Sequence, residues 1–135
     1  MSEGAFKIFI ADDNQEFANF CAEVARKEGW IPTVCCDGLE LLRSLEGEED
    51  PVLIICDLNM PHLDGIAVAQ ALPEKTSARR IRFITGGAEA NALAARLIAD
   101  ARDLAVGRFL LKPISVAHLR EILEFERAAL SKLTS

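Results

Sequence analysis

Short apolar runs alternate along the chain with longer segments in which apolar residues recur at helical spacing. Five runs have the length of β-strands and end at polar residues or at turn-forming residues. They cover residues 6–11, 31–35, 52–56, 81–85 and 106–111. The other segments predict helices over residues 15–28, 38–45, 66–72, 88–101 and from 116 onward. These strand–helix repeats predict an α/β fold, with a doubly wound parallel sheet of five strands flanked by five helices.

Residues at the ends of the predicted elements agree with this interpretation. Asn14 and Ser115 are suited to cap the first and last helices, and Gly29 is suited to end the first one. Residues 52–56 are apolar throughout, as expected for a central parallel strand that is covered on both faces. A chain of 135 residues suffices for one domain with a sizeable core, and we expect no linker and no second, output domain.

The polar residues at the ends of the runs are the most informative feature. Asp12 and Asp13 follow the first strand, Asp57 follows the third, Thr85 ends the fourth and Lys112 follows the fifth. Crossovers between parallel strands are right-handed, so the strands share one direction and their carboxyl ends meet at one edge. Ligands of such sheets bind at that edge. We therefore expect three carboxylates, a hydroxyl and an ammonium to converge there.

These side chains suit a divalent metal beside a phosphoryl group. Three crowded carboxylates repel one another, and a hard cation that prefers oxygen ligands, such as Mg²⁺, relieves the repulsion. Lys112 supplies a point charge, and Thr85 a hydroxyl donor, to an anionic ligand. One carboxylate oxygen is left to attack a phosphoryl group while the metal and the ammonium stabilise the charge that develops.

Composition and charge argue against several other classes of protein. The net charge of −6 disfavours nucleic-acid binding, which needs a basic patch or stripe. The densest basic cluster, Arg79, Arg80 and Arg82, is interpreted as a solvated entrance to the fourth strand. No apolar run approaches the ~20 residues of a membrane span, and no secretory signal is visible. We therefore expect a cytoplasmic protein that binds no membrane.

Cysteine spacing argues against a zinc site. Cys21, Cys35, Cys36 and Cys56 show no C-x-x-C spacing, and neither histidine lies near another candidate ligand in the sequence. We expect the cysteines to be small buried hydrophobes, with Cys35 and Cys36 on opposite faces of their strand. The aromatic residues are expected in the core or at its border, including Trp30 and the Phe residues at 6, 9, 17, 20 and 83.

The strand-end motifs resemble those of a known family. They are Ile10-Ala11-Asp12-Asp13, Asp57-Leu58-Asn59-Met60-Pro61 with Asp64-Gly65, Thr85-Gly86, and Lys112-Pro113. Together and in this order, they make residues 5–127 resemble a two-component response-regulator receiver domain. The resemblance implies a stand-alone bacterial receiver with the flavodoxin-like strand order 2-1-3-4-5. Residues 128–135 would then form the end of the last helix and a short tail.

The resemblance implies a role for each residue at the phosphoryl site. Asp57 matches the phosphoacceptor of the family. Asp13 would bind Mg²⁺ directly and Asp12 through water, and Asp57 and the backbone carbonyl of Asn59 would complete the protein ligands. Lys112 matches the lysine that pairs with the phosphoryl group. These assignments place the magnesium and the phosphoryl group side by side.

The remaining family positions concern switching and partner choice. Thr85 matches the switch hydroxyl, and Phe109 matches the aromatic switch residue, which is often Tyr in the family. The bond before Pro113 is expected to be cis, as is usual there. Gly86-Gly87 replaces bulkier residues and would leave the phosphoryl group more open to water. The connection over residues 86–106 is longer than in compact receivers, so we expect partner specificity to reside there.

The resemblance implies a function in two-component signalling. A histidine kinase or a histidine phosphotransfer protein would phosphorylate Asp57 in a Mg²⁺-dependent reaction. The chain would then bind a downstream protein or relay the phosphate. It would be a phosphoacceptor with intrinsic phosphotransfer and autodephosphorylation, and not an enzyme.

Two alternatives come from other classes. One is a receiver-like interaction module that never uses phosphate, although the intact set of site residues disfavours it. The other is a haloacid-dehalogenase-like phosphatase, which joins the same residue types around magnesium. That family places D-x-D after its first strand and its acidic pair last, whereas here the pair comes first. The order of the motifs therefore argues against the phosphatase.

Overall fold

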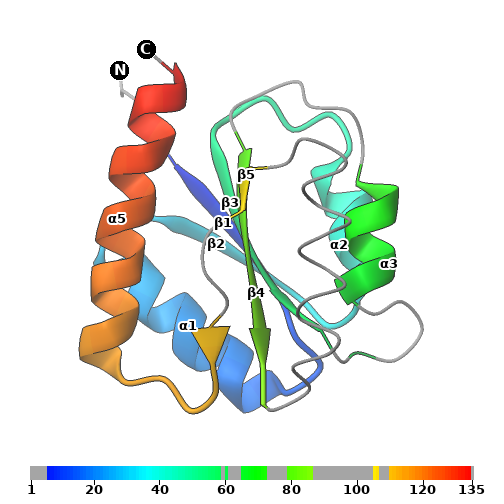
Figure 1. The fold of residues 1–135 in the computed structure, drawn as a ribbon, viewed down its shortest axis with the longest axis horizontal. Coiled ribbons are helices and arrows are strands. Elements are labelled where there is room, and N and C mark those ends of the chain that lie inside the picture. The colour runs from blue at the N-terminus through cyan, green and yellow to red at the C-terminus, as the bar shows by residue number, and fades with distance from the viewer. Residues whose placement is uncertain are drawn as a thin grey trace.

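The computed structural model describes residues 6–58, 60, 65–72, 79–86, 105–106 and 110–134. Strands and helices alternate along the chain, as the apolar pattern predicts (Figure 1). The strands are β1 (Lys7–Ala11), β2 (Ile31–Cys35), β3 (Val52–Asp57), β4 (Arg79–Thr85), β5 (Ala105–Val106) and β6 (Leu110–Leu111). The helices are α1 (Gln15–Lys27), α2 (Gly38–Leu45), α3 (Gly65–Ala71) and α5 (Val116–Thr134).

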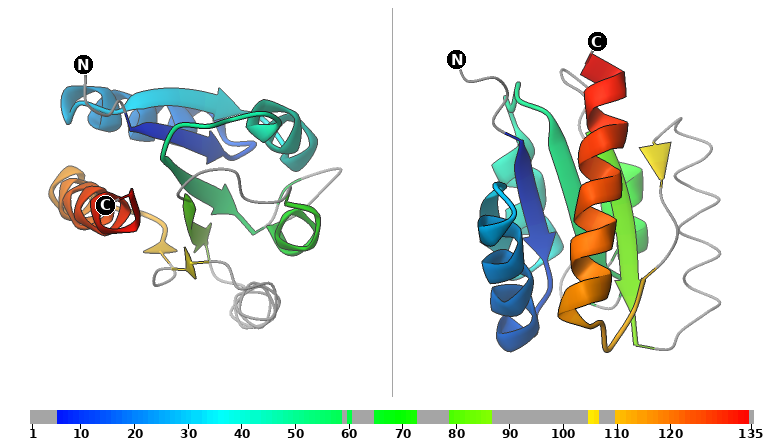
Figure 2. Two further views of the ribbon diagram at one scale, coloured as in Figure 1. Left: turned by 90° about the horizontal axis from the view of Figure 1, so that it is seen from above. Right: turned by 90° about the vertical axis from the view of Figure 1, so that its left-hand side faces the viewer.

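All strand pairs are parallel, and the order is β2-β1-β3-β4-β5, with β6 also paired to β4. Helices α1 and α5 cover one face of the sheet, and α2 and α3 cover the other (Figures 1 and 2). The predicted doubly wound fold is therefore confirmed. The predicted fifth strand is confirmed at its two ends, as β5 and β6, and its middle lies outside the described residues.

Side-chain caps fix the helix ends near the expected positions. The Asn14 side chain accepts a hydrogen bond from the Phe17 N–H at 3.1 Å and begins α1. Gly29 has φ of 90°, in the left-handed region, just after α1 ends. Ser115 Oγ accepts a hydrogen bond from the His118 N–H at 3.1 Å and begins α5. These interactions confirm the caps that the sequence predicts.

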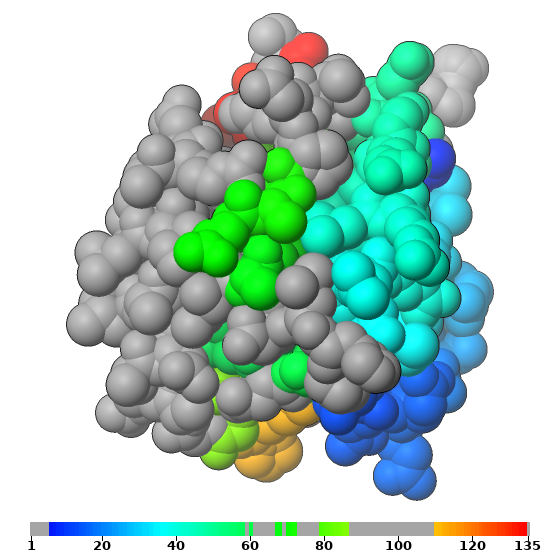
Figure 3. All heavy atoms as spheres, turned by 90° about the vertical axis from the view of Figure 1, so that its right-hand side faces the viewer, coloured from blue at the N-terminus to red at the C-terminus, as the bar shows by residue number. Residues whose placement is uncertain are grey.

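Two apolar cores lie on the two faces of the sheet. Every residue of β3 is buried, which confirms the prediction of a central strand. Its side chains alternate between the faces, so Leu53 and Ile55 belong to the core under α1 and α5. Ile54 and Cys56 belong to the core under α2 and α3, which lie side by side on the molecular surface in Figure 3. Because both faces are packed, the strand ends are held rigidly.

The interpretation of the arginines as a solvated strand entrance is wrong. Arg79 is only 4% exposed and Arg82 7%. Arg80 and Arg82 face α5, where both form ion pairs with Glu126, which is 0% exposed. The Arg82 Nε to Glu126 Oε2 distance is 2.6 Å. Glu126 thus supplies a buried anionic partner to both arginines, and β4 begins at Arg79, two residues earlier than predicted.

A second contact from α5 reaches the carboxyl end of α1. Arg127 Nη2 donates a hydrogen bond to the backbone carbonyl of Glu28 at 2.6 Å. The Arg127 guanidinium also lies over the Phe6 ring at 5.6 Å and the Trp30 ring at 5.0 Å from their centroids. Because the cation both caps α1 and stacks on core aromatics, it fixes α5 against α1.

Cysteine burial agrees in part with expectation. Cys21, Cys35 and Cys56 are buried, and burial raises the pKa of Cys21 to about 12 and of Cys35 to about 11. Cys36 is exposed, so the prediction that it is buried is wrong, and it lies just after β2, which ends at Cys35. Within the described part of the chain, no helix is long and apolar enough to cross a membrane.

Candidate functional site

Three carboxylates meet at the carboxyl edge of the sheet, as the sequence predicts. Asp12 and Asp13 follow β1, and Asp57 ends the neighbouring strand β3, whose register pairs Ala11 with Cys56. One oxygen from each carboxylate lies within 4.8 Å of the others. Asp12 and Asp57 are buried, whereas Asp13 is exposed. We call these three residues the carboxylate cluster.

Asp12 is held from both sides. Its Oδ1 accepts a hydrogen bond from the Asn14 N–H at 2.8 Å, which orients the carboxylate toward the start of α1. Its Oδ2 is fully buried and lies 2.9 Å from Lys112 Nζ, but the two atoms are not aligned as a hydrogen bond. This buried oxygen therefore faces the site with an ion-pair contact and spare capacity for a further ligand.

Lys112 follows β6 and brings a cation to the carboxylates. Its Nζ lies 2.9 Å from Asp12 Oδ2 and 3.5 Å from Asp57 Oδ2, and the side chain is mostly buried. The same atom lies 4.7 Å from the centroid of the Phe17 ring. Burial acts to lower the pKa of Lys112, but the Asp12 and Asp57 carboxylates outweigh it, so the pKa is raised above its ordinary value. The lysine therefore stays charged.

Backbone hydrogen bonds hold the remaining site positions in register. Thr85 is buried at the end of β4, and its carbonyl accepts a hydrogen bond from the Lys112 N–H at 3.0 Å. The Ile84 carbonyl accepts one from the Leu58 N–H, also at 3.0 Å. The peptide bond from Lys112 to Pro113 is cis, as expected. Thr85 and Lys112 are therefore brought to the same edge as the carboxylate cluster.

Two predicted site residues lie outside the described residues. These are Asn59, expected as a metal ligand, and Phe109, expected as the aromatic switch residue. The predicted helix over 88–101 and most of the connection over 86–106 also lie outside them. Their assignments therefore stay predictions.

The donors at this edge fit a hard divalent cation. All three residues of the carboxylate cluster offer oxygen, the ligand atom that Mg²⁺ prefers. In the part of the chain that the structure describes, the cation in contact with these carboxylates is Lys112, so the described site residues are mainly acidic. The exposed side chain of Asp13 leaves an open side, which suits a metal that keeps several of its waters. A Mg²⁺ ion would therefore satisfy both the charge and the ligand type.

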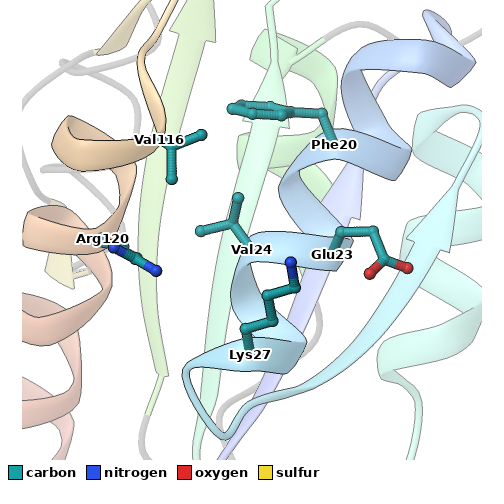
Figure 4. A pocket seen from close by; sticks show the side chains of 6 residues that line it. All are labelled: Phe20, Glu23, Val24, Lys27, Val116 and Arg120. Atoms are coloured by element: carbon teal, nitrogen blue, oxygen red, sulfur yellow. The ribbon is translucent and has the colours of Figure 1, made fainter.

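Two hollows lie beside α1. A shallow hollow of about 330 Å³ adjoins the site and is lined by Asn14, Glu16, Phe17, Phe20, Pro113 and Ile114. A second, of about 220 Å³, lies between α1 and α5 (Figure 4). It is lined by Phe20, Glu23, Val24, Lys27, Val116 and Arg120. Phe20 belongs to both, so the hollows form one surface that extends from the site along α1.

Phe17 is the site residue that sequence analysis missed. Its position at helical spacing predicts a core residue, and its ring is indeed partly buried against the core. The ring also lies against the Lys112 ammonium. A signal was present, because Phe17 comes one helical turn after Asp13 and therefore projects from the end of α1 nearest the site.

Comparison with known proteins identifies relatives over nearly the whole chain. A family model for the response regulator receiver domain matches residues 8–124. The transcriptional regulatory protein PdtaR of Mycobacterium tuberculosis is 29% identical over 130 residues, which are 96% of this chain and 60% of PdtaR. PrrA of the same species aligns over 46% of its length. The chain thus spans about half the length of these curated relatives.

Solved structures share the fold. The REC domain of AraT, a response regulator from Geobacillus stearothermophilus, has a TM-score of 0.76 and 25% identity, covering 96% of this chain and 98% of that one. The response regulator TrrA from Thermotoga maritima, in complex with Mg²⁺-BeF, has a TM-score of 0.70 and 21% identity. That alignment covers 88% of this chain and 96% of TrrA.

Proposed function

The chain belongs to the response regulator receiver domain family, and we propose that it accepts a phosphoryl group on Asp57 in a Mg²⁺-dependent reaction. The observation that carries the proposal is the carboxylate cluster, whose ligand atoms lie within 4.8 Å of one another beside the Lys112 ammonium. The related receiver of TrrA is in complex with Mg²⁺-BeF, which supports a similar ligand here. The chain acts as a phosphoacceptor and not as a turnover enzyme.

Each residue has a separate task in the transfer. An Asp57 carboxylate oxygen attacks phosphorus, a new O–P bond forms, and the bond from phosphorus to the donor atom breaks. Lys112 pairs with one phosphoryl oxygen, and the Thr85 hydroxyl donates to another. When bound by Asp12, Asp13, Asp57 and the Asn59 carbonyl, Mg²⁺ would neutralise charge on the transferred group. The buried side chains exclude water from part of the site.

The phosphoryl donor that we propose is a histidine kinase or a histidine phosphotransfer protein. The support is membership of the receiver family. Phosphorylation adds roughly one to two negative charges at the site. Thr85 would move toward the phosphoryl group and Phe109 would shift together with it. This would bias an existing equilibrium of the surface around the predicted helix over 88–101, the last strand and α5. A downstream protein, or a further phosphotransfer partner, would read that surface.

The test is phosphorylation by a small-molecule donor. Wild-type protein, incubated with acetyl phosphate and Mg²⁺, should gain the mass of one phosphoryl group, measured by intact-protein mass spectrometry. Asp57→Asn should gain none, and EDTA should abolish the gain in wild type. If wild type gains no mass with any donor, including a histidine phosphotransfer protein, the chain is a phosphate-independent interaction module instead.

A second variant separates phosphorylation from switching. Lys112→Ala should still bind Mg²⁺, because the carboxylate cluster remains, but it should lose most of the phosphorylation-dependent change at β4, β6 and α5. Amide hydrogen exchange of these elements, with and without phosphorylation, measures that change. The same exchange response in Lys112→Ala and wild type would count against a role for Lys112 in switching.

A further inference from the structure

We propose that Phe17 is a positioning residue for Lys112, holding the ammonium over the phosphoryl site through a cation–π contact. The Lys112 Nζ lies 4.7 Å from the centroid of the Phe17 ring, within the range of that interaction. Two carboxylates approach the same ammonium, from Asp12 at 2.9 Å and from Asp57 at 3.5 Å. The ammonium therefore contacts two carboxylates and one aromatic ring.

The Phe17 ring is itself held in place. Its backbone N–H donates to the capping Asn14 side chain at 3.1 Å, which fixes the first turn of α1. The ring packs against the Phe20 ring, with centroids 6.2 Å apart and planes tilted by 42°, and against the core under α1. A ring fixed at two points presents a fixed face to Lys112.

An aromatic ring suits this task better than another anion would. Lys112 has a flexible four-carbon stem, so its ammonium needs several contacts to stay in one place. The ring attracts the cation through its quadrupole. It adds no further negative charge beside an incoming phosphoryl group, unlike a carboxylate. When Lys112 turns to the phosphoryl oxygens, the ring contact can persist. Phe17 thus acts through Lys112 and touches no reacting atom.

This inference rests on the proposed phosphorylation of Asp57 for its kinetic consequence, but its geometry is testable alone. The ε-methylene protons of Lys112, next to an ammonium over a ring, should resonate upfield of ordinary lysine values in NMR spectra of the unphosphorylated protein. Phe17→Tyr should keep the upfield shift and Phe17→Leu should lose it. Ordinary ε-methylene shifts in wild type would overturn the inference whatever the phosphorylation result.

The kinetic test compares three variants with wild type. With acetyl phosphate and saturating Mg²⁺, Phe17→Leu should be phosphorylated about two- to fivefold more slowly, as the loss of one cation–π contact implies. Phe17→Tyr should retain the wild-type rate, because the ring remains. Phe125→Leu is the matched control, since it makes the same substitution at an exposed ring that contacts Arg80 and Arg82 and not Lys112, and it should also retain the rate.

The outcomes separate the two proposals. Equal rates for Phe17→Leu and Phe17→Tyr, or an equal loss in Phe125→Leu, would show that the loss of rate does not come from the ring beside Lys112 and would overturn the inference. In the Lys112→Met background, Phe17→Leu should cause no further loss of rate, because the partner of the ring is gone. A wild type with the upfield shift but no phosphorylation would leave the contact in place and overturn the proposed function instead.

Discussion

Two clusters of charged side chains lie beside β4, and they differ in sign and in how their charge is balanced. At the carboxyl edge, the carboxylate cluster contacts the ammonium of Lys112. Against α5, Arg80 and Arg82 share the buried carboxylate of Glu126. We call this second group the arginine cluster. The first is built mainly of acidic residues and includes the exposed Asp13, and the second is built mainly of basic residues and lies beside the exposed ring of Phe125.

The difference in how charge is balanced indicates a structural role for the arginine cluster and a ligand-binding role for the carboxylate cluster. In the arginine cluster, both guanidinium groups bond the same buried carboxylate and lie over the Phe125 ring, at 5.9 and 5.6 Å from its centroid. Its contacts are therefore supplied within the chain. The carboxylate cluster brings three oxygen ligands within 4.8 Å of one another and is open at the exposed Asp13, so a cation from solution would fit there. One cluster holds the fold together, and the other is open to a ligand.

The largest effect on stability is expected from a substitution that disrupts the arginine cluster. Glu126→Gln keeps the shape of the side chain but removes the buried carboxylate charge that Arg80 and Arg82 share. We expect the free energy of unfolding to fall by about 3 kcal/mol, as for other buried pairs that lose one partner. Urea denaturation measures it, and Glu124→Gln, exposed on the same helix, is the control. A loss as small as in the control would mean that the cluster contributes nothing to stability.

The second largest effect on stability is expected from Mg²⁺ binding at the carboxylate cluster. Adding Mg²⁺ should raise the free energy of unfolding, because the ion binds the folded chain and not the unfolded one. At a concentration 100 times its dissociation constant, the gain should be about 2.7 kcal/mol. Glu126→Gln should show the same gain, since its defect lies elsewhere. Thermal unfolding with Mg²⁺ and with EDTA measures it, and identical curves would refute magnesium binding.

Loss of one carboxylate charge should have opposite effects on stability in the two clusters. It should destabilise the protein in the arginine cluster and, by a smaller amount, stabilise it in the carboxylate cluster. Asp13→Asn removes one of three mutually repelling charges, so without Mg²⁺ it should stabilise the protein by up to about 1 kcal/mol. It should also remove most of the gain from Mg²⁺. Glu121→Gln, exposed on α5, is the control for loss of a negative charge at the surface. Destabilisation by Asp13→Asn in EDTA would show that the carboxylates do not repel one another there.

The smallest effect belongs to an exposed counterpart of the arginine cluster. Lys7 Nζ lies 3.1 Å from both Glu48 Oε2 and Asp50 Oδ2, near the surface. We expect Lys7→Gln to cost less than about 1 kcal/mol at neutral pH. Glu48, and then Asp50, raise the pKa of Lys7 above 10.5, so its contribution is full below 10.5 and is lost as pH rises through the folded-state value. Urea denaturation of wild type and Lys7→Gln, from neutral pH to above pH 10.5, should show that the difference between their free energies of unfolding becomes smaller as the pH rises.

The sequence was enough to predict the carboxylate cluster and most element boundaries. Asp12, Asp57 and Lys112 each follow an apolar run, and parallel strands bring such positions to one edge by topology alone. The rule that parallel strands share a carboxyl edge needs no knowledge of side-chain contacts. It therefore predicts that residues far apart in the chain lie next to one another at that edge.

The arginine cluster could not be predicted in the same way. Arg80 and Arg82 look solvated because hydropathy treats each residue without its partner, and the partner, Glu126, lies on the last helix. Phe17 posed a related problem, since helical spacing identifies it as a core residue but does not show which cation its ring contacts. In both cases the missing information was a pairwise contact between distant segments.

The contact of Arg127 with Trp30 has a practical consequence. Trp30 is the single tryptophan of the chain, and the chain contains no tyrosine, so intrinsic fluorescence excited at the indole band comes from one place. That place is buried at the end of α1, beneath a guanidinium supplied by α5. The fluorescence of Trp30 in the wild-type protein therefore reports on the interface between α1 and α5. Undocking of α5 could be followed in real time without any added label.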